Sequence, residues 1–451
     1  MALRLPIGSS DFKQLRREGL HFVDKSLFIR DVLQAPDRVL LFPRPRRFGK
    51  TLNLTMLAAW LTRGDDDCSD VFADLAVWQQ GAEVRQHFQR YPVIYLTFKD
   101  VKSRTWVDCR ASIARLIAEA AGHHAGRIDA VIQSDDDRQL WRALRSGDAE
   151  NADLWRALKA MPAWLHLATG EPCVILIDEY DTPLHAAWQH GYWEEAVELF
   201  RNLLSGGFKD NPHLFKGVLT GILRIGKESI FSGLNNLAVH SLLSRQFSPH
   251  FGFLQGEVEA LALGSDAPDA MPGIEEWYNG YRFGGNTIYN PWSVINYLNN
   301  REDGFKPYWV NTASNDLLVQ LLVERTTLQQ QELEILLAGG VIEQVIEENT
   351  VLRSLAGSPT ALWSFLLFSG YLRAGTHVNP GAHQIDREGR AVPPRRHARR
   401  LHGAQRDDHG LPARVGLGSH RRRDQGRVLG RQEHAQVLPG DREVRLPRLQ
   451  R

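Results

Sequence analysis

The sequence predicts an α/β protein built on a parallel sheet with helices on both faces. Residues 39–42, 91–98 and 173–177 are short apolar runs, the pattern of strands buried inside a sheet. Helical patterns lie between these runs, the longest of them over residues 108–170. Strands that alternate with helices in this way are typical of α/β folds with a parallel sheet.

The first of these strands is followed by a basic loop with the pattern of a phosphate-binding P-loop. The loop ends in Gly49-Lys50-Thr51, and a helical pattern begins there. In a P-loop the amides of the helix N-terminus bind phosphate, the lysine reaches the β- and γ-phosphates, and the hydroxyl binds Mg²⁺. Arg44 stands where the full pattern has a glycine, and Pro45 lacks an N–H. The candidate ATP-binding residues are therefore Arg46, Arg47, Phe48, Gly49, Lys50, Thr51 and Leu52. A turn that precedes an ordinary helix is the alternative interpretation.

A pair of carboxylates follows the third apolar run, at the carboxyl end of the predicted strand. Open α/β sheets bind ligands at this end of their strands. In a P-loop enzyme Asp178 would bind Mg²⁺ together with Thr51, and Glu179 would act as the general base that polarises the attacking water. The alternative is a strand that ends in an acidic turn before Pro183.

A fourth strand is predicted at residues 217–220. Thr220, at its end, would lie beside Glu179 and sense the γ-phosphate. Arg224 would meet transition-state charge in the way that an arginine finger does. The predicted catalytic residues are thus Glu179, Thr220 and Arg224. For the last two, a strand-end threonine and a surface arginine remain the alternatives.

The composition is that of an ordinary protein with a large core. The chain has 451 residues, of which 43% are hydrophobic and 24% are charged. Residues 1–373 carry a net charge of −8, so they do not demand a polyanionic partner. Three scattered cysteines predict reduced thiols, without disulfides or a zinc site. There is no signal-peptide pattern and no run of ~20 apolar residues, so we expect a soluble, cytoplasmic protein.

The last 78 residues, from Ala374 onward, differ in character from the rest. They contain 17 Arg and 7 His but no Lys, Phe, Trp or Tyr, and their only isoleucine is Ile385. A segment of this composition cannot build a core, so we expect it to be disordered. A basic tail for nucleic acid would normally be rich in lysine as well. We therefore interpret the segment as GC-rich DNA translated out of frame.

Several motifs together resemble the AAA-ATPase-like family of prokaryotic proteins, which usually carry a C-terminal PD-(D/E)xK nuclease-like domain. The resemblance covers about residues 5–373 and includes the Arg-Pro-Arg-Arg-Phe-Gly-Lys variant of the P-loop. It implies ATP and Mg²⁺ as ligands and a nucleotide-driven switch that controls a DNA-directed effector. The motifs are residues 22–26, 44–51, 174–181 and 224–236, and then 277–283, 289–293 and 362–372.

The resemblance also predicts the domain organisation. We expect an AAA-ATPase-like P-loop domain at residues 5–255, a mainly helical accessory region at 256–373, and a disordered tail at 374–451 in place of the nuclease-like domain. A nuclease needs metal-binding carboxylates and a lysine, but no lysine follows Lys306, and Glu443 has no predicted strand around it. We therefore expect no nuclease activity in this chain.

The predicted function is Mg²⁺-dependent ATP binding and hydrolysis, and a homo-oligomer would be compatible with it. Two alternatives stay open. One is a nucleotide-binding regulator that does not hydrolyse ATP, and the other is a DNA-binding module that uses the basic loop. The aromatic residues between Trp277 and Tyr297 are interpreted as the packing of the accessory region, with base stacking as the alternative.

Overall fold

The computed structural model of the 451-residue chain describes most of residues 3–374 and two short segments beyond them. Of residues 359, 360, 375–378 and 398–403 it describes the backbone alone. The described residues are 3–64, 66–223, 230–231, 234–309, 326–338, 340–346, 348, 359–378 and 398–403.

Five parallel strands form the main sheet, in the order β2-β3-β4-β1-β5. The order matters for function because β4 lies between β1, which leads into the predicted P-loop, and β3, which ends in Asp178. The register pairs Phe42 of β1 with Thr220 of β4, and Ile177 of β3 with Leu219. The five strands are β1 (Val39–Pro43), β2 (Val93–Thr97), β3 (Cys173–Asp178), β4 (Leu214–Gly221) and β5 (Leu237–Val239).

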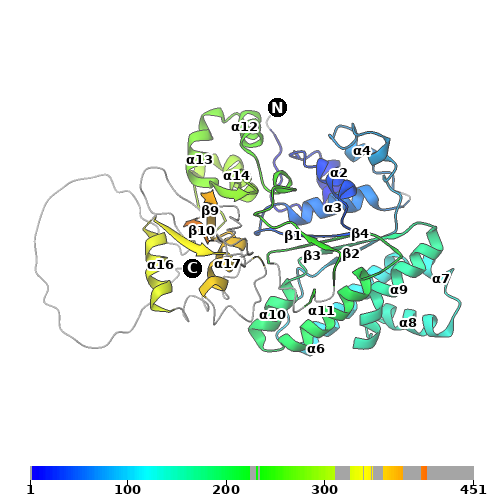
Figure 1. The fold of residues 1–451 in the computed structure, drawn as a ribbon. Helices are drawn as coiled ribbons and strands as arrows, with labels where there is room; N and C mark the ends of the chain where they lie inside the picture. The colour runs from blue at the N-terminus through cyan, green and yellow to red at the C-terminus, as the bar shows by residue number, and fades with distance from the viewer. Residues whose placement is uncertain are drawn as a thin grey trace, which may run out of the picture. The chain divides into compact units, whose positions relative to one another are not determined.

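Helices cover both faces of this sheet, which confirms the predicted fold class. Figure 1 shows α2 and α3 on one face and α6, α9 and α11 on the other. The helices in this part of the chain are α1 (Phe12–Arg17), α2 (Leu27–Gln34), α3 (Lys50–Leu61), α4 (Ser69–Phe72), α5 (Ala82–Arg85), α6 (Trp106–His123), α7 (Ala125–Asp129), α8 (Asp135–Ser146), α9 (Asn151–Thr169), α10 (Thr182–His190) and α11 (Trp193–Phe208).

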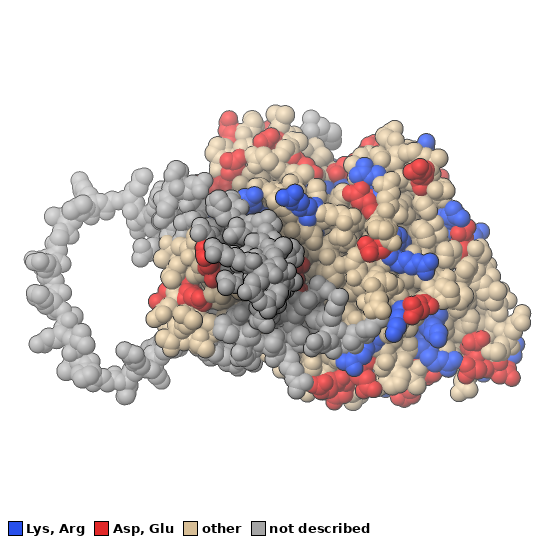
Figure 2. All heavy atoms as spheres, in the orientation of Figure 1, with Lys and Arg blue, Asp and Glu red and all other residues tan. Residues whose placement is uncertain are grey.

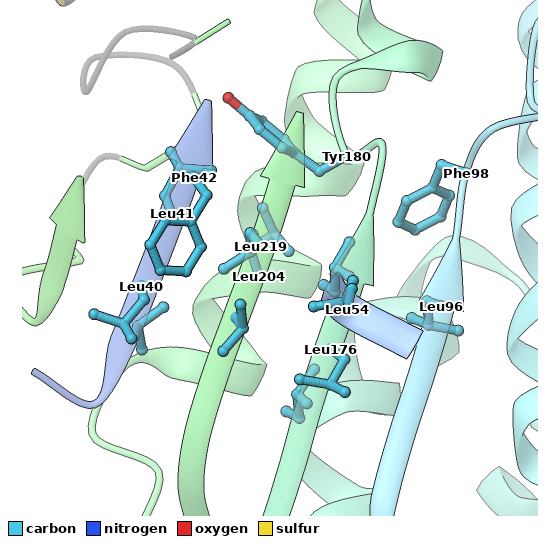
Figure 3. Close-up of a cluster of buried hydrophobic side chains, with 14 of the residues drawn as sticks. Leu40, Leu41, Phe42, Leu54, Leu96, Phe98, Leu176, Tyr180, Leu204 and Leu219 are labelled. Atoms are coloured by element: carbon cyan, nitrogen blue, oxygen red, sulfur yellow. The ribbon is translucent and has the colours of Figure 1, made fainter. Parts of the chain in front are cut away.

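The strands are buried on both sides because their sequences are apolar almost throughout. Every residue of β1 and β3 is buried. Figure 3 shows Leu41, Leu176 and Leu219, which come from three neighbouring strands, in one hydrophobic cluster with Leu54 of α3. Burial of this apolar area, at roughly 25 cal/mol per Å², is the main force that holds the helices on the sheet.

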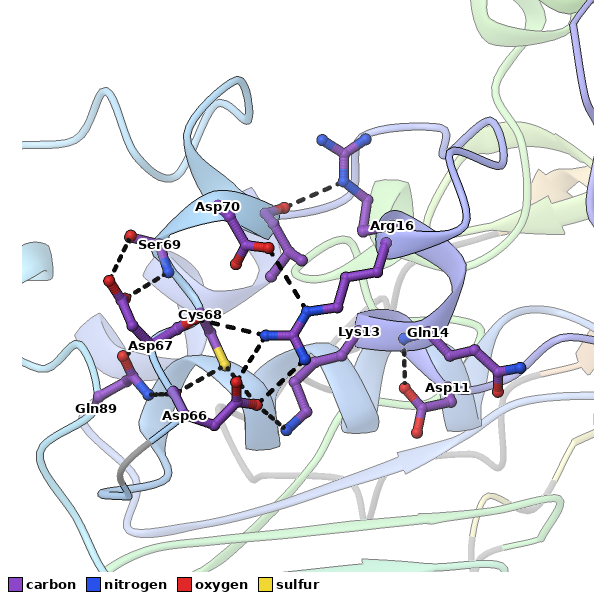
Figure 4. A network of polar contacts seen from close by, with 12 residues as sticks. Asp11, Lys13, Gln14, Arg16, Asp66, Asp67, Cys68, Ser69, Asp70 and Gln89 are labelled. Carbon is purple, nitrogen blue, oxygen red and sulfur yellow. Dashed lines mark hydrogen bonds and ion pairs between the residues drawn. The ribbon is translucent and has the colours of Figure 1, made fainter.

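The acidic turn after α3 links α1 to the start of α4 through hydrogen bonds. Asp66 accepts hydrogen bonds from Lys13 Nζ at 3.0 Å and from Arg17 Nη2 at 2.8 Å, which joins the turn to α1 (Figure 4). These charges lower the pKa of the exposed Asp66 carboxyl to about 2. Asp67 caps the start of α4 through the amide of Ser69. These carboxylates therefore have a structural role on the surface.

The accessory region contains more strand than the sequence predicted. Its helices are α12 (Gln255–Gly264), α13 (Met271–Tyr278), α14 (Pro291–Asn299), α16 (Thr327–Leu337) and α17 (Pro359–Phe368). Between α13 and α14 lies an antiparallel hairpin of β6 (Asn279–Phe283) and β7 (Asn286–Tyr289). Its two-residue turn is Gly284-Gly285, both with positive φ, the sequence pattern that favours a tight hairpin. Tyr278, Tyr289 and Tyr297 pack into a second hydrophobic core, in line with the packing interpretation.

A three-stranded antiparallel sheet crosses the boundary predicted at Ala374. Its order is β8-β10-β9, with β8 at Val341–Val345, β9 at Leu372–Val378 and β10 at Ala398–Gly403. The expected disordered tail thus contains the end of β9 and the whole of β10, because backbone pairing does not require the apolar side chains that this segment lacks. Residues 379–397 and 404–451 lie outside the described part. No helix among the described residues is long and apolar enough to cross a membrane.

Candidate nucleotide-binding site

The predicted site residues come together at the carboxyl edge of the main sheet. The loop of residues 44–49 follows β1, Asp178 ends β3, and Thr220 lies near the end of β4. Because β4 separates the other two strands, the hydroxyl of Thr220 reaches Asp178 from one side and Thr51 of α3 reaches it from another. The structure therefore brings together the two motifs that the sequence separates by about 130 residues.

The loop turns into α3 through two residues in the left-handed region. Arg47 has φ 68° and Gly49 has φ 81°, and α3 begins at Lys50. Glycine adopts this conformation without strain, whereas at Arg47 the surrounding contacts must hold it. The amides of Lys50, Thr51 and Leu52 lie in the first turn of α3, where backbone N–H groups have no helical acceptor. These amides are therefore available to an anion, and their role in phosphate binding stays a prediction.

Lys50 points back into the loop and is 4% exposed. Its Nζ donates to the carbonyl oxygens of Arg44 at 3.2 Å and Pro45 at 3.1 Å, and lies 3.5 Å from Oε1 of Glu179. The lysine is therefore held at the centre of the loop by three oxygen atoms. A phosphate oxygen that binds Lys50 must take the place of at least one of them.

Asp178 is fully buried and forms the centre of a hydrogen-bonded chain. Its Oδ2 accepts from Thr51 Oγ1 at 2.8 Å, and its Oδ1 accepts from the hydroxyl of Thr220. Burial raises the pKa of Asp178, and the nearby charge of Glu179 adds to this effect. The two hydroxyl donors and Lys50 act in the opposite direction. A cation placed at this carboxylate would compensate the cost of its burial.

The oxygen atoms of Thr51 and Asp178 fit a magnesium ion that is bound together with a nucleotide. Mg²⁺ prefers oxygen ligands and in nucleotide sites takes only one or two from the protein, the rest coming from phosphates and water. The described residues contain no group of three or more His, Cys, Asp or Glu side chains that could hold a metal ion by themselves. The hydroxyl–carboxylate pair therefore suits an ion that arrives with its nucleotide.

Glu179 adopts an unusual backbone conformation at the end of β3. Its φ is 52°, a left-handed value that is uncommon for a residue other than glycine. The carboxylate is 21% exposed and lies between Lys50 Nζ and the hydroxyl of Thr182, which is 3.4 Å from Oε2. Strained backbone of this kind often holds a side chain in a functional position. Glu179 is thus accessible to a water molecule while it remains beside Lys50.

The two residues after Glu179 anchor the end of β4, a role that the sequence did not reveal. Asp181 is buried, and its Oδ2 accepts from the amides of Ile222 at 2.8 Å and Leu223 at 3.0 Å. The hydroxyl of Tyr180 donates to the carbonyl of Leu223. A Cβ at Gly221 would lie 2.6 Å from the ring of Tyr180, so only glycine fits there. Arg224, the predicted arginine finger, lies outside the described residues.

Arg44 explains why the loop does not need a leading glycine. Its side chain is fully buried, and its guanidinium carbon lies 4.7 Å from the ring centre of Phe251 and 5.6 Å from that of Phe283. Nη1 donates to the carbonyls of Pro43 and His240, whereas Nε and Nη2 have no partner. The side chain thus fills a pocket beside the loop and leaves the phosphate side to the backbone.

The other predicted loop residues divide into exposed and buried groups. Arg47 is exposed, and its guanidinium carbon lies 4.1 Å from the ring centre of Trp292. Arg46 is half-buried, and Phe48 is buried against Tyr281. For Phe48 and Leu52 only the backbone amide remains as a phosphate donor, because their side chains are apolar. Arg47 is the loop cation with the freest access to a ligand.

Comparisons with known proteins found chains that are similar in sequence and in structure. A protein of Azotobacter chroococcum mcd 1, described as an uncharacterised protein in the vnfD 5′ region, is 29% identical over 392 residues, or 84% of this chain. The chain spans 66% of the length of that relative. A Walker-type ATPase of Pyrococcus abyssi is similar in structure, with a TM-score of 0.40 and 14% identity over 80% of this chain and 93% of its own.

The family model described as predicted AAA-ATPase matches residues 6–231. This range begins before α1 and includes the P-loop, the β3 carboxylates and Thr220. It extends over half of the chain and includes β1, β3 and β4, the strands that lead to the site residues. The chain belongs to the predicted AAA-ATPase-like family.

Proposed function

We propose that this protein binds ATP with Mg²⁺ and hydrolyses it at the carboxyl edge of the main sheet. The observation that carries the proposal is the chain Thr51–Asp178–Thr220 beside the close pair Lys50–Glu179. Phosphate-binding amides, a metal-binding oxygen pair and a carboxylate base thus lie within one small region. Family membership supports the same assignment.

Each side chain has a distinct role in this mechanism. Lys50 and the first amides of α3 bind the β- and γ-phosphates, while Thr51 and Asp178 hold Mg²⁺. The ion, when bound, neutralises phosphate charge. Glu179 accepts the proton of the attacking water, and the hydroxyl of Thr220, which donates to Asp178, keeps that carboxylate oriented. Most of the catalysis in such a site is positioning and charge stabilisation.

The proposal is tested by two substitutions that separate binding from chemistry. Lys50→Ala should abolish most ATP affinity, because the lysine contacts the phosphates in both the ground state and the transition state. Glu179→Gln should retain ATP binding but hydrolyse ATP about 10²–10⁴-fold more slowly, the usual contribution of a positioned base. Calorimetric titration of ATP and a phosphate-release assay measure the two effects.

Glu171→Gln provides the matched control. Glu171 precedes the opposite end of β3 and pairs with Arg90 at 2.9 Å, so its loss should leave turnover unchanged. Absence of saturable ATP binding in the wild-type protein, or wild-type turnover in Glu179→Gln, would overturn the assignment. Turnover that vanishes in both glutamate variants would instead point to a general loss of structure.

The structure favours hydrolysis over the two alternative functions. A carboxylate 3.5 Å from the P-loop lysine is what a hydrolysing enzyme needs and what a passive regulator does not. Arg44 could not contribute to DNA binding by the basic loop, because its side chain is fully buried. On the face shown in Figure 2, basic and acidic side chains are interspersed on the described surface. Salt-dependent DNA binding that ATP does not affect would revive that alternative.

We further propose that the ATPase acts as a nucleotide-driven switch for a DNA-directed effector, as the family resemblance implies. Contacts between the P-loop and the accessory region support a switch, whereas the DNA-directed role rests on the resemblance alone. A change in ATP turnover on addition of duplex DNA would test that role. Turnover per molecule that rises with protein concentration would indicate a homo-oligomer with a shared site, the arrangement in which Arg224 acts across subunits.

A further inference from the structure

The P-loop is held by the accessory region along its whole length. Each residue from Arg44 to Phe48 contacts a residue that lies between positions 281 and 370 of the chain. The ring centre of Phe283 lies 5.6 Å from the guanidinium carbon of Arg44, and Trp309 Nε1 donates to the carbonyl of Arg46 at 3.3 Å. These contacts are available to link the nucleotide site to another part of the chain.

Two of these contacts leave little freedom in the loop. The ring of Phe48 lies 4.8 Å from that of Tyr281. A Cβ at Gly370, which has φ 91°, would lie 2.9 Å from Cβ of Pro45. The two backbones therefore approach so closely that only glycine is compatible with the contact. The accessory region therefore packs directly against the P-loop.

Trp292 makes the contact that matters most for chemistry. Its ring centre lies 4.1 Å from the guanidinium carbon of Arg47, within the range of a cation–π interaction. The indole is fixed at the start of α14, and its Nε1 donates to the carbonyl of Tyr308 at 3.2 Å. Among the described residues, Arg47 has no carboxylate within ion-pair distance. The aromatic face therefore replaces a counter-ion and leaves the guanidinium free to bind an anion.

The charge of Arg47 interacts electrostatically with the proposed base. Burial and the neighbouring charge of Arg46 lower the pKa of Arg47, while the charge of Glu179 opposes this change. The exposed Arg47 and the buried Lys50 thus both interact electrostatically with Glu179. An anion bound beside Glu179 would meet both cations. The γ-phosphate is the part of ATP expected at this position.

We propose that Trp292 is a positioning residue of the ATPase: it holds the guanidinium of Arg47 against the γ-phosphate, so that the accessory region completes the phosphate site. This inference rests on the proposed function and assigns part of the γ-phosphate recognition to a residue about 240 positions downstream of the P-loop. It also supplies a route by which movement of the accessory region changes nucleotide affinity. Trp292 acts through Arg47 and has no chemical role of its own.

A double-mutant cycle tests the inference directly. The variants are Trp292→Leu, Arg47→Met and the double variant, and the measured quantities are the affinities for ATP and ADP with Mg²⁺. Trp292→Leu should weaken ATP binding about two- to fivefold, the factor that corresponds to a cation–π contact, and weaken ADP binding less. In the Arg47→Met background the same tryptophan substitution should have no further effect, since the residues act as one unit. Trp292→Phe, which retains an aromatic face, should restore the ATP affinity.

Trp277→Leu is the matched control. Trp277 belongs to the same region and stacks on Phe305 at a ring-centre distance of 6.0 Å, so its loss removes an indole without touching Arg47. Equal effects of Trp277→Leu and Trp292→Leu, additive effects in the cycle, or an unchanged ATP-to-ADP preference would each refute the positioning role. If the wild-type protein does not bind ATP at all, the proposed function itself fails. If it binds ATP and Lys50→Ala abolishes binding while the cycle is additive, only this inference fails.

Discussion

Replacement of Arg44 provides a strong test of how this P-loop is built. Arg44→Gly restores the glycine of the common P-loop pattern, whereas Arg44→Met keeps a long side chain and removes the charge. If the side chain serves to fill the pocket between Phe251 and Phe283, methionine should be tolerated and glycine should not. If a glycine at this position is needed for phosphate binding, the opposite result is expected for ATP affinity.

The magnitudes follow from the surroundings of Arg44. Truncation of a large, fully buried side chain usually costs about 3 to 5 kcal/mol in the free energy of unfolding, and Arg44→Gly should fall in this range. Arg44→Met loses the hydrogen bonds to two carbonyl oxygens. It also loses a cation–π contact, which contributes about 2 kcal/mol when it is buried. It also relieves the burial of an ion with two unpaired N–H groups, which costs several kcal/mol. We therefore expect Arg44→Met to lie within about 2 kcal/mol of the wild type.

Urea unfolding of the two variants measures these differences, and its pH dependence adds a second criterion. Burial lowers the pKa of Arg44 to about 9 from 12.5. Because the folded state disfavours the charged form, the wild type should gain stability relative to Arg44→Met as the pH rises through about 9. ATP affinity should not improve in Arg44→Gly. Equal destabilisation by glycine and methionine would refute the reasoning, because it would mean that the charge itself stabilises the loop.

Two further predictions concern the site and the end of the chain. Burial raises the pKa of Asp178 above 3.8, so Asp178→Asn should be more stable than the wild type at about pH 8 in the absence of Mg²⁺ and nucleotide. This difference in stability should shrink toward about pH 4, where the carboxyl of the wild type becomes protonated in both the folded and the unfolded state. Thermal melts at both pH values measure the difference, and a difference that does not change with pH would contradict the prediction. Removal of residues 404–451, which contain no aromatic residue, should shift the melting temperature by only a few degrees, and a collapse of the melting transition in the truncated protein would show that this segment supports the fold.

The elements of the main sheet were predictable because each has a strong local signal. Uniform apolar runs predicted β1 and β3, and the residues that follow these strands predicted the phosphate loop and the carboxylates. The sequence predicted Thr220 beside Glu179, and in the structure its hydroxyl donates to Asp178, the residue before Glu179. The sheet order, in which β4 lies between β3 and β1, accounts for this contact. Local patterns and simple sheet geometry were sufficient for this half of the site.

The other half depends on contacts that no local pattern records. Trp292 lies 245 positions after Arg47, and Asp181 holds amides that lie about 40 positions downstream. The buried position of Arg44 was equally hidden, because an arginine in a basic loop is usually exposed. The hairpin of β6 and β7 carried a usable signal in Gly284-Gly285, which the helical interpretation of the accessory region passed over. These positions depend on long-range packing, so local sequence patterns could not predict them.

The Lys50–Glu179 pair leads to a prediction about ATP binding itself. In Glu179→Gln the lysine loses an anionic neighbour 3.5 Å away, and the triphosphate no longer meets a carboxylate charge beside its γ-phosphate. Both changes favour the bound nucleotide. A partly exposed ion pair contributes up to about 1 kcal/mol, so ATP should bind to Glu179→Gln between equally and about fivefold more tightly than to the wild type. Titration with ATP and Mg²⁺ at two salt concentrations measures the effect and its electrostatic origin.

The same titration distinguishes a base from a metal ligand. If Glu179 bound the magnesium ion directly, the glutamine variant would bind ATP more weakly and would need a higher Mg²⁺ concentration for half-saturation. A higher Mg²⁺ requirement is expected of Asp178→Asn instead, because Asp178 accepts a hydrogen bond from Thr51 and the two residues form the proposed metal site. Tight ATP binding with the Mg²⁺ dependence of the wild type, together with lost turnover, leaves proton acceptance as the role of Glu179. Weaker, Mg²⁺-sensitive binding would move Glu179 into the metal site and leave the reaction without its proposed base.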